Sequence, residues 1–101
     1  MTEADILRMG AIVCADIANQ VAPILIAERS EPVNPADSGW QFTCGRTDPP
    51  HFDNAQVWLL REVLEREPSL KECTNLPVGT RLQRESDRAP WSCVSGGNVP
   101  T

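Results

Sequence analysis

The sequence offers few of the side chains from which catalytic and metal sites are built. It has a single histidine, His51, and its four cysteines, Cys14, Cys44, Cys73 and Cys93, are too far apart for a zinc knuckle or a Cys-x-x-Cys redox motif. No glycine-rich loop precedes a helix in the manner of a phosphate-binding site. We therefore expect reduced thiols that pack as small hydrophobic groups, no cofactor and no metal. A small enzyme or zinc protein that uses His51 with the cysteines is the alternative that these residues leave open.

Long apolar runs and an excess of positive charge are also missing. The apolar runs are too short to span a bilayer, and the first residues are acidic where a secretory signal is basic. The formal net charge is −5, which opposes binding to nucleic acid or to an anionic membrane. We therefore expect a cytoplasmic protein, and the acidic balance is compatible with a protein partner that has a basic surface.

The length of 101 residues suits one domain. We expect this domain to cover 1–95 and a flexible tail to follow over 96–101. Five short strands are expected, over 11–15, 21–29, 39–45, 80–85 and 91–94. The pattern is clearest over 39–45, where large and small or polar residues alternate with the period of two that a half-buried strand shows.

The clearest helix signal follows Asp53, whose carboxylate can cap free backbone N–H groups. It predicts a helix over 54–66, with Val57, Leu60 and Leu64 on its apolar stripe. A shorter helix is expected over 3–9 and a polar turn over 16–20.

These elements predict an α+β fold. A mainly antiparallel sheet of about five strands carries one main helix on one face, with the short N-terminal helix beside it. The expected core draws large apolar residues from both layers: Ile12, Ile24, Ile26, Trp40, Phe42, Leu60, Leu64, Leu82 and Trp91.

Candidate functional side chains each have a structural explanation beside the functional one. Asp37, Asp48 and Asp53 could supply paired carboxylates, but they precede a turn, precede a proline and cap a helix. His51 lies in an expected loop over 46–52 without a local nucleophile signature. Trp58 falls beside the main helical stripe, where it either covers the edge of the core or anchors a partner.

Residues 37–45, Asp-Ser-Gly-Trp-Gln-Phe-Thr-Cys-Gly, carry the most distinctive pattern of the chain. Together with 28–32 before it and 76–84 after it, this segment resembles a bacterial family of immunity proteins from polymorphic toxin systems, the immunity protein 33 family. Members of that family show an Arg-Glu-x-Pro-like stretch, then Asp-Ser-Gly-Trp-x-Phe-x-x-Gly, and later a Pro-x-Gly turn. Leu82 stands where the family usually has an aromatic residue, and the acidic segment after Gly45 is reduced to two aspartates.

The resemblance implies a non-catalytic protein that binds and blocks a cognate toxin. A generic regulatory or scaffolding module with an unknown partner is the alternative, and an open sheet edge would allow either a monomer or a homodimer. The predicted partner-binding residues lie mainly on the loops that flank the central strand: Glu28, Arg29, Glu31, Asp48, His51, Asp53 and Trp58.

Overall fold

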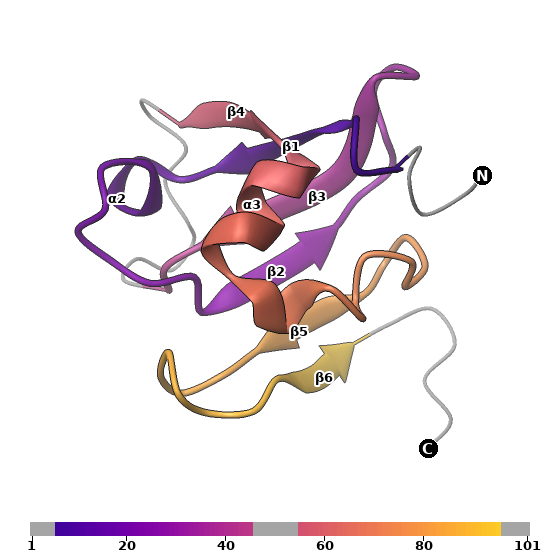
Figure 1. Cartoon of the computed structure of the whole chain (residues 1–101). Helices are drawn as coiled ribbons and strands as arrows, with labels where there is room; N and C mark the ends of the chain where they lie inside the picture. The colour runs from indigo at the N-terminus through magenta and orange to yellow at the C-terminus, as the bar shows by residue number, and fades with distance from the viewer. Residues whose placement is uncertain (1–5, 46–54, 96–101) are drawn as a thin grey trace.

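A computed structural model describes residues 6–45 and 55–95 of the protein as an α+β fold, in which helix α3 lies across one face of a single sheet (Figure 1). In chain order the elements are β1 (Gly10–Val13), α2 (Ala15–Ala18), β2 (Ile26–Arg29), β3 (Asp37–Thr43), β4 (Gln56–Leu59), α3 (Leu60–Arg66), the 3-10 helix η1 (Pro68–Leu70), β5 (Arg81–Gln83) and β6 (Ser92–Ser95).

The sheet has six strands in the order β4-β1-β3-β2-β5-β6, one more than expected. Four of the strand pairs are antiparallel, which confirms the mainly antiparallel prediction, but β1 and β3 run parallel. The chain between these two strands contains α2 and β2, which supplies the length that a parallel connection needs. The central strand β3 is therefore paired on both sides, with β1 and with β2.

The core lies between α3 and the sheet. Trp40 and Phe42 point to the same face of β3, with stacked rings whose centroids lie 6.0 Å apart, and both side chains are buried. Leu60, Val63 and Leu64 are the buried residues of α3. The apolar face predicted for this helix is thus confirmed from Leu60 onward.

The expected helix over 54–66 is wrong in its first part, because Gln56–Leu59 forms β4. This strand pairs antiparallel with β1, which satisfies backbone groups that a first helical turn leaves without partners. Val57 consequently lies 75% exposed instead of on the helical stripe. The helix begins only at Leu60, where the Glu62 carboxylate accepts the Leu59 N–H at 2.9 Å. The capping role predicted for Asp53 lies outside the described residues.

Two further expectations near the N-terminus are corrected. The segment 16–20 is not merely a polar turn, because Ala15–Ala18 forms α2 and buries Ile17 completely. The strand expected over 21–29 begins only at Ile26, since Pro23 has no N–H to donate to a ladder. The expected helix over 3–9 lies partly outside the described residues, and the predicted tail 96–101 lies wholly outside them.

The predicted core is mostly confirmed. Ile12 and Ile26 are only partly buried because they lie on the sheet face opposite α3. Trp91 is also only partly buried, and it packs against the edge of the core. The remaining predicted residues are all buried: Ile24, Trp40, Phe42, Leu60, Leu64 and Leu82.

Candidate functional site

The Asp-Ser-Gly-Trp motif, residues 37–40, forms a set of hydrogen bonds within the fold that we call the brace. One oxygen of Asp37 accepts the Val33 N–H at 3.0 Å and the other accepts the Gly39 N–H at 2.9 Å. The buried Ser38 hydroxyl donates to the Gly10 carbonyl at 2.7 Å, which ties β3 to β1. These side chains already use their polar atoms inside the fold, so the motif itself presents little chemistry to a partner.

Arg29 joins this brace. Its Nε donates to the Ser38 carbonyl at 3.0 Å and its Nη1 donates to the Leu76 carbonyl at 2.8 Å. The guanidinium lies 5.9 Å from the Trp40 ring, and Trp40 Nε1 donates to the Thr74 carbonyl at 3.1 Å. Burial lowers the pKa of Arg29. Arg29 was predicted to bind a partner, and the structure places it between β3 and the segment after η1.

The two predicted glutamates lie at the end of β2 and in the loop beyond it. Glu28 forms an ion pair with Arg81 at 2.7 Å, and both side chains are about a third exposed. Glu28 pairs with Gln41 across the strands, on the sheet face opposite α3. Glu31 is exposed in the loop between β2 and β3. The structure therefore places Glu28 opposite Gln41 of the central strand and Glu31 in the loop that leads to that strand.

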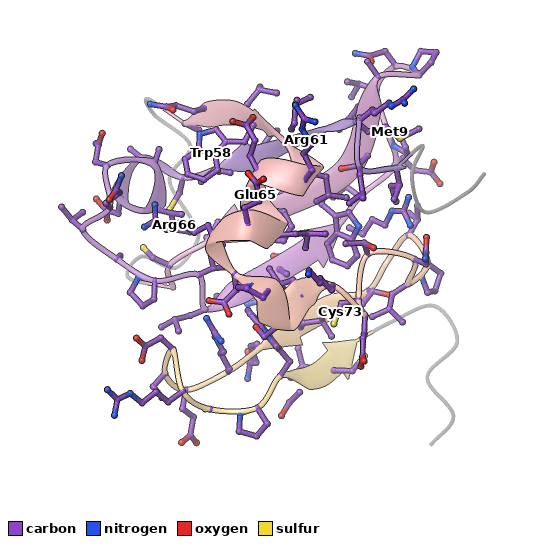
Figure 2. All side chains as sticks on the ribbon, viewed as in Figure 1. Met9, Trp58, Arg61, Glu65, Arg66 and Cys73 are labelled. Atoms are coloured by element: carbon purple, nitrogen blue, oxygen red, sulfur yellow. The ribbon has the colours of Figure 1, made fainter. Side chains whose placement is uncertain are left out.

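Trp58 lies on the opposite face of the sheet from Glu28. It pairs with Ala11, whose side chain is buried in the core, and its ring packs against the edge of that core. Arg66 approaches the Trp58 ring to 5.9 Å, and Figure 2 shows both side chains beside α3. The indole N–H donates to Gln56 Oε1 at 3.1 Å. Of the two alternatives for Trp58, the structure favours covering the core edge.

The three other predicted partner-binding residues, Asp48, His51 and Asp53, lie outside the described residues. Among the residues that the structure describes, no group of three or more metal-ligating side chains comes together. The four cysteines form no disulfide, and the Cys44 thiol donates to Asp16 Oδ2 at 3.7 Å.

Accessibility predicts the order in which the thiols react. Cys93 is exposed, Cys73 is half-buried, and Cys14 and Cys44 are buried. Burial, and then the charge of Glu72, raises the pKa of Cys73 and lowers its thiolate fraction at neutral pH. We expect dithionitrobenzoate to modify Cys93 first, Cys73 more slowly and the buried pair only on unfolding. Mass spectrometry of partly labelled protein gives the order, and a fast phase that persists in Cys93→Ser would contradict it.

Sequence reasoning missed a hollow on the sheet face opposite α3. It has a volume of about 220 Å³ and is lined mainly by apolar groups from β1, β4 and the loop before β3, among them Ile12, Val33, Ala36 and Val57. Val57 pairs with Ile12 across the two strands, which places their side chains on the same face. The one signal in the sequence was Val33, a large aliphatic residue in a loop of small, polar and proline residues.

Within residues 6–45 and 55–95, no helix has the length and apolar character needed to cross a membrane. Searches of the curated proteins and of the solved structures find no match. A family model described as the Immunity protein Imm33 domain matches residues 11–95, which includes every strand except the first residue of β1. The chain therefore belongs to the Imm33 immunity-protein family.

Proposed function

We propose that this protein is an immunity protein that binds a cognate bacterial toxin and blocks it, without catalysing a reaction of its own. The observation that carries the proposal is the match of the Imm33 domain to residues 11–95. It is supported by the use of the motif side chains, since Asp37, Ser38 and Arg29 satisfy their polar atoms within the fold. A blocking protein needs a stable scaffold and a complementary surface, and this arrangement supplies the scaffold.

The surface that we assign to the toxin is the sheet face opposite α3 together with the loop between β2 and β3. This region carries Glu31, which is exposed, and Glu28, which is about a third exposed. Carboxylates at the rim of an interface steer a basic partner and raise its association rate. The net charge of −5 has the same sign, so it favours the approach of a basic toxin surface from a distance.

Co-expression tests the proposal. The toxin encoded beside this gene in its host is expressed in cells whose growth it arrests, with and without this protein. We expect growth to recover in its presence and the two purified proteins to form a complex in size-exclusion chromatography. Persistent growth arrest together with separate elution of the two proteins would contradict the proposal.

Charge reversal at Glu31 is expected to weaken the complex. Because Glu31→Lys replaces an attractive rim charge by a repulsive one, the dissociation constant should rise about three- to tenfold at low salt. The dependence of the association rate on ionic strength should also become shallower. Surface plasmon resonance at several salt concentrations measures both. Glu72→Lys changes the same charge at an exposed position after η1 and serves as control; equal effects from both variants would mean that only net charge matters.

A further inference from the structure

The hollow on the sheet face opposite α3 is bordered by exposed apolar side chains. Val33 and Val57 are 86% and 75% exposed, the two highest values among the large hydrophobic residues in the described part of the chain. They are far apart in the sequence but line the same hollow, together with Ile12, which pairs with Val57. A single exposed valine needs no explanation, whereas apolar residues gathered around a concavity mark interaction sites.

The hollow exists because β1 begins with glycine. A Cβ atom at Gly10 would lie 3.0 Å from Val57 Cγ1 and 3.7 Å from the Ala36 carbonyl oxygen, so a side chain there would enter this space. The opposite wall is held in place by short-range hydrogen bonds. Asn34 Oδ1 accepts the Ala36 N–H at 2.8 Å, and the Asp37 carboxylate accepts the Val33 N–H. A wall that is ordered before binding reduces the entropy that a partner must offset.

The volume indicates the size of the occupant. An apolar cavity of about 150 Å³ accommodates benzene, whereas pockets for cofactors and drug-sized ligands begin at about 300 Å³. At about 220 Å³, this hollow suits one leucine, methionine or phenylalanine side chain. Single apolar side chains seated in such pockets are typical anchors of protein interfaces.

We propose that the hollow receives one large apolar side chain from a basic segment of the toxin. This inference rests on the proposed function and identifies the contact at its centre. No lysine or arginine lines the hollow, and Glu31 lies exposed in the loop that also carries Val33. An apolar anchor flanked by positive charge is complementary to that arrangement.

The same charges argue against a second copy of this chain as the occupant. A two-fold interface centred on the hollow would place the same patch of each subunit against its counterpart. The loops that carry Glu31 would then face each other, and like charges brought together at an interface are destabilising. A basic toxin segment, in contrast, would be attracted by the negative charge of Glu31 on the same loop.

Three variants test the anchor by isothermal titration with the purified toxin encoded beside this gene. Val33→Ser with Val57→Ser removes the apolar rim without adding charge, and Gly10→Leu fills the hollow. We expect the dissociation constant of the toxin complex to rise at least tenfold in each of these two variants, because one anchor contact is lost. Val21→Ser, at a valine that is 62% exposed but outside the hollow, should leave the constant within about threefold of the wild type.

The outcomes separate this inference from the proposed function. Wild-type affinity in both the double-serine variant and Gly10→Leu, with toxin binding otherwise intact, would overturn the anchor and leave the proposed function standing. A wild-type protein that does not bind the toxin would overturn both. Sedimentation equilibrium covers the other occupant: a dimer that the double-serine variant dissociates, with unchanged toxin affinity, would assign the hollow to a second copy. Thermal unfolding shows whether each variant is folded, and the rim variant is informative even where Gly10→Leu is not.

Discussion

Replacing Gly39 by alanine should lower the free energy of unfolding by more than about 3 kcal/mol, a large part of the stability of a domain of this size. Gly39 has a φ of 84°, in the left-handed region that costs a residue with a side chain about 1–2 kcal/mol. An added Cβ would also overlap the backbone carbonyl oxygen of Ser30. Because that carbonyl belongs to the chain that leaves β2, the overlap cannot be relieved by rotating a side chain. Chemical denaturation of Gly39→Ala measures the loss.

Gly45→Ala is the matched control for this prediction. Gly45 has a similar φ of 71°, but its added Cβ would meet only side-chain atoms, the nearest being Ile26 Cδ1 at 3.4 Å. We therefore expect a loss of about 1–2 kcal/mol there, the cost of the backbone conformation alone. The difference between the two variants isolates the overlap at Gly39. Equal losses would show that β2 and β3 separate easily and that the brace described above is not rigid.

The central strand could be predicted from the sequence because two local signals agree there. Trp40 and Phe42 alternate with smaller or polar residues, and the turn residues before them mark the entry. The structure places the strand at Asp37–Thr43, two residues earlier at both ends than the predicted 39–45, and keeps both aromatic side chains in the core. Period and turn chemistry are properties of a short segment, so they need no knowledge of the rest of the fold.

The start of α3 could not be predicted in the same way. Residues 57–59 are three consecutive apolar residues, and a short apolar run of this kind fits either a strand or a helix by period alone. The choice is made by β1, which offers β4 a hydrogen-bonding edge that is far away in the sequence. The parallel pairing of β1 with β3 is non-local in the same sense. For this reason the sequence wrongly predicts Val57 on the helical stripe, and it does not predict the hollow that Val57 lines.

The family motif and the proposed contact surface occupy different residues. Ser38 and Trp40 are buried and hydrogen-bonded within the sheet, so they are available to hold the fold and not to distinguish one toxin from another. Glu31, Val33 and Val57 are exposed, and changes at such positions cost little stability. Under the proposed function, relatives that share the scaffold can differ in partner by changing the loop before β3 and the exposed side of β4.

Arg84→Met should cost about 3 kcal/mol in unfolding free energy, because it removes the buried guanidinium from an ion pair with the partly buried Glu67. The Arg84 side chain is only 2% exposed, and its Nη2 lies 2.6 Å from Glu67 Oε1. Its Nε donates to the Ile24 carbonyl at 3.0 Å, and its guanidinium lies 4.5 Å from the centre of the Trp91 ring. These contacts join α3, the segment before β2 and the segment before β6, so methionine leaves Glu67 without its cation and the carbonyl without its donor.

Arg81→Met provides the comparison, since Arg81 lies on β5, just before Arg84 in the chain, and also pairs with a glutamate, but at about a third exposure. We expect a loss below about 1 kcal/mol there.

The pH dependence of stability gives an independent test of the pair between Arg84 and Glu67. Burial acts to raise the pKa of Glu67, but the hydrogen bonds and charge of Arg84, with a hydrogen bond from Ser69, lower that pKa below the ordinary carboxyl value of 4.5. A lowered pKa in the folded state stabilises the protein above the unfolded value, and this stabilisation is lost as the pH falls through the folded one. The stability gap between the wild type and Arg84→Met should therefore narrow below about pH 4.5, and a gap that stays constant from pH 7 to pH 3 would mean that packing around Arg84, not its charge, joins these segments.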